Sequence, residues 1–434
     1  MSFFDAVEQA VRGFECEGTR AQDFRLAMAE TVQSALGIGS NRRGSPYEPL
    51  TVSDAAGGSM LVRWSDGLVS RGALTRAPAA ALAEVLRSAF EGRYEDADVV
   101  DFPEEAAVPG IELYSEETAR IAGGENADAL PQVLEILEGI RARSGAKLLD
   151  ASAQAVRIRR RVVTSRGFRA EGESTRTVFW LGLDSLAFDG FESRTPFAAE
   201  EVGRRAAWTA ADYAALKPEA GNAPKGPTTV VLHPRTAESF LRTFLFGSLS
   251  GSAVANGRSR FSREDFESGR IAFREDFSLV TRPLIPMGVG SFSFTDEGVL
   301  AREVELIRDG VPITPLLGLK YARRLGMDPT PAPGSIDGYE FTLDTRVSRE
   351  EALFGPGRCI LVHSVMGLHT QDPVRGEYSV LAPQGVLYED GTCQGRVTAT
   401  LNGSFFEDLR SAELSLVDFE GYACPGLKLL VELS

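Results

Sequence analysis

The chain has 434 residues, of which 43% are hydrophobic and 25% charged, as is usual for a soluble globular protein. One hydrophobic core rarely extends past roughly 250 to 300 residues, so two or three domains are expected. Asp and Glu outnumber Lys and Arg, 61 to 46, and a net charge of −15 disfavours a nucleic-acid partner.

The first hundred residues predict helices around a hairpin. The opening stretch MSFFDAVEQAVRGFECEG predicts an amphipathic helix with Phe4, Val7 and Val11 on one side, and its acidic residues are untypical of a secretory signal. Further patterns predict a strand at 24–36, a hairpin about an Asp-Gly turn within 59–75, and a helix at 77–92.

The next segment, 95–117, is acidic, contains proline and lacks periodicity, so it is interpreted as a connector between two halves. Asp128 is expected to cap a helix that Gly145 ends. The patterns then predict strands at about 154–165 and 174–186 and a helix at 199–216.

A basic run, RIRRRVVTSRGFR, covers residues 157–169. Arg157, Arg159 and Arg161 alternate along it, which favours one exposed face of a strand, with an anion or partner site as the alternative.

A run of Gly, Pro, Asn and Lys at 217–227 predicts a domain boundary. Beyond it we expect a strand running into a helix, then mostly short strands with Asp-Gly hairpin turns at 309–310 and 390–391. The predicted fold class is α+β. An N-terminal α+β domain, 1–222, has halves of about 1–95 and 112–222, and a C-terminal β-rich, sandwich or barrel-like domain covers 227–434.

The four cysteines, Cys16, Cys359, Cys393 and Cys424, show neither a metal-type spacing nor a disulfide framework. No run approaches the roughly 18 apolar residues of a membrane span. We therefore expect a cytoplasmic protein with no membrane partner.

Three histidines are the candidates for metal chemistry, and no HExxH string links them. His233 stands at a strand-to-helix junction, which favours a structural role. His363 and His369 are six residues apart and, on one extended strand, their side chains would lie roughly 20 Å apart. The spacing argues against a shared ion, and leaves a polar role at a groove or interface, or ordinary hydrogen-bonded histidines.

Two acidic residues, Asp296 and Glu297, are adjacent in FTDEGV. Adjacent side chains on a strand point to opposite faces. A turn or cap therefore suits them better than an acid–base pair.

Taken in order, the segments TTVVLHPRTAESFL, SFSFTDEGVLAREVELIRDGV, LKYARRLG, GLHTQDPVRGEYSV and GYACPGLKLLVELS resemble the TldD/PmbA family, once described as modulators of DNA gyrase. Upstream, VVTSRGFR resembles the segment before a strand pair in that family. The likeness covers most of the chain. It implies a complex of two related chains, TldD and TldE (PmbA), forming a heterodimeric peptidase.

In the family, TldD carries zinc on an HExxxH helix and has a cysteine near its C-terminus. The matching segment here is VLHPRTAESF, where His233 lies near the first ligand but Pro234 replaces the glutamate and no second histidine follows. Zinc hydrolysis needs three protein ligands, an open coordination position and a base. The segments around His369 and Cys424 resemble TldE instead.

The resemblance therefore predicts a non-catalytic TldE-like subunit that encloses unfolded or modified peptides beside a zinc-bearing TldD-like partner. No catalytic or metal-binding residue and no cofactor is assigned to this chain. His363, His369, Thr370, Asp296 and Glu297 are the candidates for an interface or substrate channel. Whether the chain is itself an enzyme stays open. The alternatives are an independent metal-dependent hydrolase using His363, His369 and Cys393 or Cys424, and a homodimeric peptide-binding scaffold.

Overall fold

A computed structural model describes residues 2–39, 49–76, 79–99, 101–126 and 128–434. The strands before the predicted boundary form one seven-stranded sheet of order β4-β3-β2-β5-β6-β7, with β1 paired to β2. The strands are β1 (Glu15–Cys16), β2 (Thr19–Ile38), β3 (Thr51–Trp64), β4 (Val69–Thr75), β5 (Leu149–Thr164), β6 (Arg169–Leu183) and β7 (Ala187–Ser193). The predicted connector separates two hairpin groups, which join where β2 pairs antiparallel with β5.

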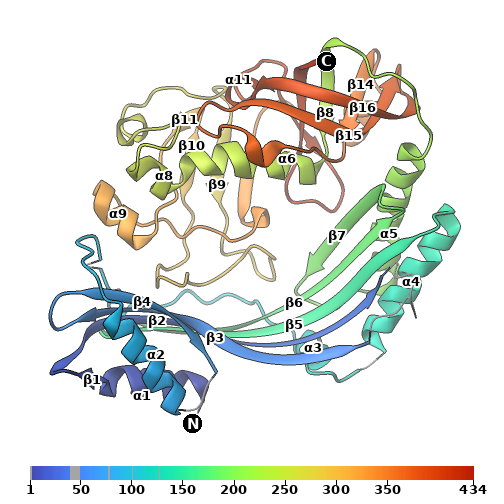
Figure 1. Ribbon diagram of the computed structural model, residues 1–434. Helices are drawn as coiled ribbons and strands as arrows, with labels where there is room; N and C mark the ends of the chain where they lie inside the picture. Colours follow the sequence, from blue (N-terminus) through green and yellow to red (C-terminus); the bar gives the residue numbers. More distant parts are fainter. Residues whose placement is uncertain (1, 40–48, 77–78, 100, 127) are drawn as a thin grey trace.

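The turn between β6 and β7 was not predicted, and the expected strand at 174–186 runs past it. Asp184 and Ser185 both have positive φ, 52° and 55°. Such a turn usually carries Asn-Gly or Asp-Gly, so Asp-Ser gives a weak sequence signal. The hairpin makes β7 the edge strand of the sheet nearest the second half of the chain (Figure 1).

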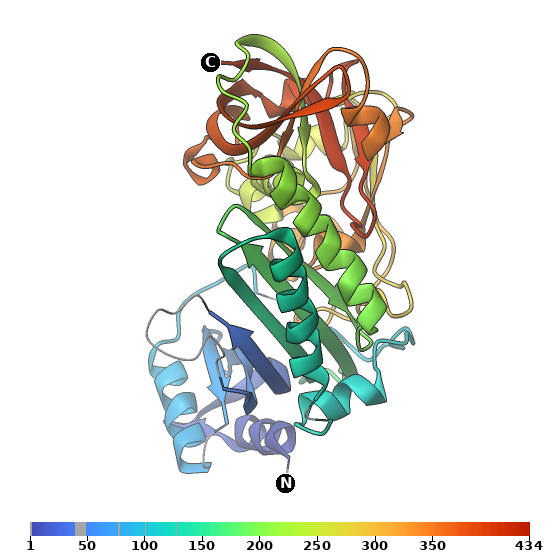
Figure 2. The same cartoon turned by 90° about the vertical axis from the view of Figure 1, so that its right-hand side faces the viewer.

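Helices cover both ends of this sheet. They are α1 (Phe3–Gly13), α2 (Ala79–Glu91), α3 (Glu116–Ala122), α4 (Ala129–Ser144) and α5 (Ala199–Leu216). Phe4, Val7 and Val11 of α1 are buried against β2 and α2, which confirms the predicted apolar side. Figure 2 shows α4 and α5 side by side across the strands.

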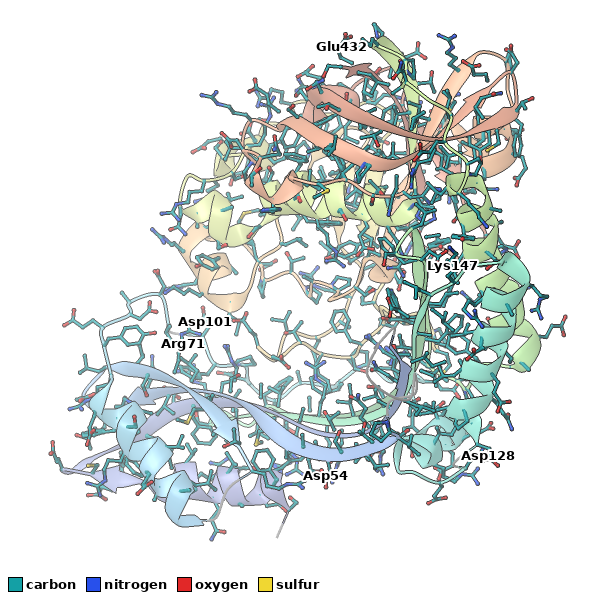
Figure 3. The ribbon with its side chains drawn as sticks, turned by 45° about the vertical axis from the view of Figure 1, so that its right-hand side comes forward. Asp54, Arg71, Asp101, Asp128, Lys147 and Glu432 are labelled. Carbon is teal, nitrogen blue, oxygen red and sulfur yellow. The ribbon has the colours of Figure 1, made fainter. Side chains whose placement is uncertain are left out.

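The predicted C-terminal end of α4 is confirmed, whereas the predicted N-terminal cap is not. Gly145 ends the helix at φ 71°, as expected for a left-handed cap. Asp128, which stands at the start of α4 in Figure 3, makes no side-chain cap. Its backbone is helical and a capping residue needs extended φ and ψ, so the expectation of an Asp128 cap is wrong.

The second half is built on a closed ring of strands. β8, β14, β15, β16 and β18 follow one another as neighbours, and β18 pairs back onto β8, which gives the predicted barrel-like architecture. Their bounds are β8 (Gly226–Leu232), β14 (Arg358–Val362), β15 (Glu377–Glu389), β16 (Thr392–Ser404) and β18 (Gly426–Leu433). β17 (Ser415–Asp418) pairs with β18 and with β13 (Arg346–Ser348).

Both predicted Asp-Gly turns are confirmed. Asp309–Gly310 and Asp390–Gly391 have positive φ at both positions and connect β10 to β11 and β15 to β16. β15 and β16 have 13 residues each and are longer than expected. A separate four-stranded sheet holds β9 (Ser278–Thr281), β10 (Glu305–Arg308), β11 (Val311–Pro312) and β12 (Tyr339–Thr342).

Helical segments of the second half are short. β8 runs into α6 (Pro234–Phe240), which continues as a π-helical segment, Leu241–Phe246, and α7 (Gly247–Leu249). The others are α8 (Gly251–Ala255), α9 (Leu319–Leu325), α10 (Arg349–Leu353), α11 (Phe405–Asp408) and the 3-10 turns Arg263–Phe266, Ile336–Gly338 and Leu368–Thr370. Among the helices that the structure describes, none is long and apolar enough to cross a bilayer.

The hydrophobic core is continuous across the two halves. α4, α5 and β5–β7 contribute buried residues to a cluster that also contains Val231 of β8, Leu361 of β14 and Val386 of β15. Val202, Ala206 and the rest of the buried side of α5 therefore lie against the barrel as well as the sheet. Because apolar burial is the main favourable term in folding, this shared core holds the two halves in a fixed arrangement.

Candidate functional site

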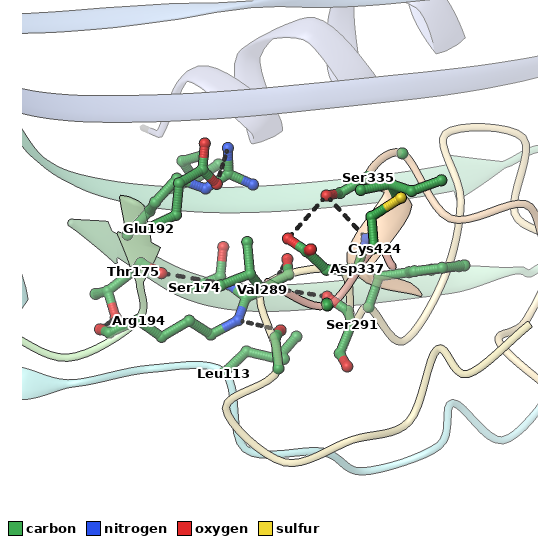
Figure 4. Close-up of a pocket in the computed structure, with 18 of the residues that line it drawn as sticks. Leu113, Ser174, Thr175, Glu192, Arg194, Val289, Ser291, Ser335, Asp337 and Cys424 are labelled. Atoms are coloured by element: carbon green, nitrogen blue, oxygen red, sulfur yellow. Dashed lines mark hydrogen bonds and ion pairs between the residues drawn. The ribbon is translucent and has the colours of Figure 1, made fainter. Parts of the chain in front are cut away.

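A cavity of about 1020 Å³ lies between the first sheet and the second half of the chain (Figure 4). It is lined by main chain and side chains of β6 and β7, by α6 with the π-helical segment, and by the loops 288–296, 332–337 and 421–424. We call it the interdomain cleft. Ligands often bind between domains. π-Helical segments are rare in proteins as a whole, and those that occur are often found at functional sites.

The edge strand β7 presents main chain to the cleft. Gly190 accepts a hydrogen bond from Arg235 Nη2 at 2.6 Å through its carbonyl oxygen, and its N–H donates to the Asp189 carboxylate at 2.7 Å. Main-chain groups of alternate strand residues point to the same side, so those of Glu192 also point away from β6. The described contacts leave the Glu192 main chain as an open edge along the cleft.

Several charged side chains of the cleft form ion pairs with one another or with nearby carboxylates. Glu238 of α6 accepts from Arg242 at 2.7 Å, Arg176 lies 3.4 Å from Glu192, and Arg235 pairs with buried Asp189. Burial raises the pKa of Asp189 to about 6, although the Arg235 guanidinium favours its charged form. The cleft is therefore polar without a strong excess of either sign.

Arg194 ties β7 to the opposite wall and has no carboxylate partner. Its guanidinium donates to the carbonyls of Gly288 at 2.8 Å, Val289 at 3.0 Å and Ser291 at 2.8 Å, and to Thr175 at 3.3 Å (Figure 4). Burial lowers its pKa to about 10. These hydrogen bonds fix the floor of the cleft in place of an ion pair.

Cys424 reaches the cleft from the loop before β18. It is 4% exposed, and burial, with Glu238 and Asp337 nearby, raises the pKa of its thiol well above its usual range. Burial also raises the pKa of Asp337, which accepts from Ser335 Oγ at 3.2 Å. A protonated thiol is a poor nucleophile and a poor metal ligand.

Behind the cleft wall lies a buried group of Asp212, His233 and His363, which we call the histidine cluster. Their ligand atoms lie within 4.8 Å of one another, and the imidazole rings stack at 5.1 Å. His363 Nδ1 is 3.8 Å from Asp212 Oδ2. Tyr422, which lines the cleft, contacts the His233 ring edge-on at 5.1 Å between centroids. No other such group of three His, Cys, Asp or Glu residues occurs in the described part of the chain.

Burial sets the protonation of this cluster. It lowers the pKa of His233 well below the usual range and that of His363 to about 3, and it raises the pKa of Asp212 to about 7. Both imidazoles are therefore neutral at physiological pH. Arg349, 3.6 Å from Asp212, is the nearest cation and favours the charged carboxylate.

His363 and His369, six residues apart in the sequence, have different surroundings in the structure. His363 directly follows β14 and is partly buried, with 10% of its side chain exposed. His369 is exposed on the turn Leu368–Thr370, where Thr370 Oγ1 donates to the Gly367 carbonyl. One continuous strand does not carry them. His363 is no ordinary hydrogen-bonded histidine, because its buried Nε2 has no partner.

The two adjacent carboxylates have different surroundings. Asp296 lines the cleft and pairs with Arg160. Glu297 accepts from the Leu319 N–H at the start of α9 at 2.6 Å and from Arg25 at 3.3 Å, so it connects the two halves. The preference for a cap at Glu297 agrees with these contacts.

No sequence pattern marks Asp212 or Arg194 as a functional residue. Asp212 is one of many acidic residues on a helix, and its burial depends on where α5 meets the barrel. The juxtaposition of His233 and His363 follows from the parallel pairing of β8 with β14, in which Leu232 is opposite Val362. A sequence-level signal did exist here, since each histidine directly follows a run of buried apolar residues.

Comparison with known proteins identifies the family of the C-terminal domain. Residues 225–429 match the model of the PmbA/TldA metallopeptidase C-terminal domain. This match shows that residues 225–429 form a domain of the TldD/PmbA family, in agreement with the family that the sequence segments predicted. An uncharacterized protein from Methanocaldococcus jannaschii is 24% identical over 264 residues, which is 58% of this chain and 60% of that relative.

Solved structures share the whole fold. TldE from Thermococcus kodakarensis superposes with a TM-score of 0.77 at 16% identity, covering 100% of this chain and 99% of that one. A candidate modulator of a DNA gyrase from Thermotoga maritima gives 0.75 at 18% identity, covering 100% of both chains. These likenesses confirm the α+β architecture.

A metallopeptidase family raises the question of whether the cleft fits a catalytic zinc ion. Catalytic zinc sites use three ligands drawn mainly from His, Cys and acidic residues, with an open position for water. The described cleft lining contains no histidine, its one thiol is buried and protonated, and Glu238 is paired with Arg242. The donor set of the cleft does not fit that ion.

Proposed function

We propose that this chain is the non-catalytic, TldE-like subunit of a heterodimeric metallopeptidase that acts on unfolded or modified peptides. The zinc ion and the base would come from a TldD-like partner, and this chain would help to enclose the substrate. We place the complex in the cytoplasm, where free cysteines persist, and all four cysteines here are free.

The observation that carries the proposal is the chemistry of the cleft. Where α6 and the π-helical segment border it, the cleft has Arg235, Glu238 and Arg242, each in an ion pair. A group already neutralised by an ion pair is poorly placed to act as a general base at neutral pH. Along its described lining, the cleft offers space and a main-chain edge for a peptide, but it has no histidine and its thiol is buried.

An extended peptide can be held by adding a strand to a sheet edge, which gives affinity through main-chain hydrogen bonds and little sequence preference. β7 supplies such an edge at Glu192, while Gly190 is already occupied by Asp189 and Arg235. We infer that substrate main chain pairs beside Glu192. This arrangement suits a complex that accepts unfolded peptides.

The test is co-expression with a TldD-like chain that carries HExxxH. Cleavage of an unfolded peptide is measured for each chain alone and for the pair. We expect cleavage by the pair only, and co-elution of the two chains on size exclusion. Cleavage by the partner alone at the same rate would remove the assigned role, and cleavage by this chain alone would make it an enzyme. A stable homodimer with peptide affinity and no partner would favour the scaffold alternative.

The independent hydrolase built on His363, His369 and Cys393 or Cys424 has less support. Cys424 is buried and His363 partly buried, whereas His369 and Cys393 are exposed. Within the described chain these residues do not form a group with converging ligand atoms.

A further inference from the structure

The histidine cluster is assembled from three segments that are distant in sequence. His233 and His363 leave the parallel strands β8 and β14 at the same edge, and the His233 N–H donates to the Val362 carbonyl at 3.0 Å. Asp212 comes from α5, on the other half of the chain. The cluster therefore lies at the junction that joins the first sheet and its helices to the barrel.

The cluster has unmet hydrogen-bonding capacity. Within the described chain, the buried side-chain polar atoms without a partner are Thr209 Oγ1, Thr236 Oγ1 and His363 Nε2. Thr209 is one helical turn before Asp212 and Thr236 one turn after His233, so all three unpaired atoms belong to the segments that form the cluster. Buried polar groups in folded proteins almost always have a hydrogen-bond partner. Three unpaired polar atoms on the segments of one cluster therefore indicate a bound ligand.

Asp212 makes only long ion pairs with its charged neighbours. Its nearest charged neighbours are Arg349 at 3.6 Å and His363 at 3.8 Å, and both distances exceed a hydrogen bond. Arg349 faces Oδ1 and His363 faces Oδ2. Asp212 Oδ2 can therefore bind a ligand while Oδ1 faces the Arg349 guanidinium, and carboxylates that bind metals are commonly held by a second contact in this way.

The donor atoms of the cluster indicate which kind of ligand it would bind. Two imidazoles and one carboxylate offer lone pairs, which an anion would not bind and a divalent cation would. Binding through His233 Nδ1 would replace the hydrogen bond that this atom accepts from the Arg235 N–H at 3.4 Å. Nitrogen and oxygen ligands at about 2.0–2.1 Å are typical of Zn²⁺, and tetrahedral geometry then places donor atoms about 3.3–3.5 Å apart. The present spread of up to 4.8 Å requires side-chain shifts of only about 1 Å. The nearby Arg349 cation weakens binding without blocking Oδ2.

We propose that Asp212, His233 and His363 form a structural Zn²⁺ site that joins α5 to the barrel. The three protein ligands leave one coordination position to water, but Asp212 is only 16% and His363 10% exposed, so a peptide substrate has no access to the ion. The site is distinct from the cleft and does not depend on the proposed function. A metal that binds the folded chain and not the unfolded chain would stabilise the junction between the halves.

The experiment uses the full chain, stripped with a chelator, supplied with ZnCl₂ and dialysed. We expect about one zinc per chain by mass spectrometry and a zinc-dependent rise in Tm. His363→Gln keeps a polar side chain of similar size and is expected to lower zinc affinity by at least roughly 100-fold. His369→Ala is the matched control, since it removes an exposed histidine six residues away, and its zinc content should stay at the wild-type value.

Cobalt provides a second measurement on unaltered protein. Co²⁺ bound by two histidines and a carboxylate should give visible ligand-field bands without thiolate charge-transfer absorption. A wild-type chain that holds no zinc, equal zinc in wild type and His363→Gln, or a thiolate band would each overturn the site. Peptide cleavage by the paired chains is a separate readout, so failure here leaves the proposed function to its own test.

Discussion

The cleft and the histidine cluster are neighbours separated by Tyr422, yet they have opposite characters. The cleft is open, and Arg235, Glu238 and Arg176 in it form ion pairs. The cluster is closed, and it holds a buried imidazole nitrogen with no partner. The two proposals therefore place the peptide and the metal ion at different positions, whereas a metal-dependent hydrolase needs both in one place.

The largest expected effect tests whether the cleft is a preformed space. Arg194→Met removes four hydrogen bonds to carbonyls and leaves those carbonyls buried, which should lower the free energy of unfolding by about 3 kcal/mol. Urea unfolding measures it. Arg176→Met is the control, because its half-exposed pair with Glu192 should contribute less than about 1 kcal/mol. Equal losses in the two variants would show that Arg194 does not hold the cleft.

Asp408 and Tyr378 form a hydrogen-bonded pair, in contrast to the histidine cluster, where His363 Nε2 has no partner. Burial raises the pKa of Asp408 to about 6, and Tyr378 partly offsets this by donating a hydrogen bond at 2.8 Å. The unfolded value is about 3.9, so between about pH 4 and 6 the folded state holds a proton that the unfolded state has lost. Its stabilising contribution is complete below pH 4 and is lost as the pH rises through 6.

Asp408→Asn removes this titration. We expect the fall in stability of the wild type between pH 4 and 7 to exceed that of the variant by on the order of 2 kcal/mol. Denaturant unfolding at several pH values measures the difference. Parallel curves for the two proteins would contradict the assignment.

A smaller effect concerns the open edge at Glu192. Glu192→Pro removes one outward N–H, whereas Glu192→Ala keeps it and removes the same charge. Losing one main-chain hydrogen bond should raise the KM of the paired complex about three- to tenfold for the proline variant alone. Steady-state peptide cleavage measures this, with circular dichroism to check folding. Equal KM values would place the substrate elsewhere.

The smallest effect on stability is expected at the exposed turn Leu368–Thr370. His369→Ala and Thr370→Ala should change the unfolding free energy of the isolated chain by less than about 0.5 kcal/mol. If the turn contributes to an interface or channel, partner-dependent cleavage falls while stability is unchanged. Unaltered cleavage in both variants would remove these residues from the list of candidates.

Local signals in the sequence predicted much of the fold. The apolar side of α1, the Asp-Gly turns and the bounds of α5 all follow from patterns within a few residues. The failures were also local, since Asp128 has helical backbone and the turn at Asp184 lacks glycine. Each failure reflects a backbone conformation that the residue type does not impose.

The candidate site was much less predictable. In the sequence, His363 and His369 are the histidines that lie close together. In the fold, His363 instead lies beside His233, 130 positions earlier, and beside Asp212 on α5. Pairing of β8 with β14 and the shared core with α5 create that contact. No periodicity within one segment encodes such a meeting.

The closure of the barrel also has a consequence for synthesis on the ribosome. β8 is the first strand of the second half, and one of its edges is covered by β18, the last strand to emerge. Until residues 426–433 leave the exit tunnel, that edge stays unpaired and able to pair with another nascent chain. The ordering of this domain is therefore governed by long-range strand pairing, which is slow, and we expect early release of the nascent chain to favour aggregation.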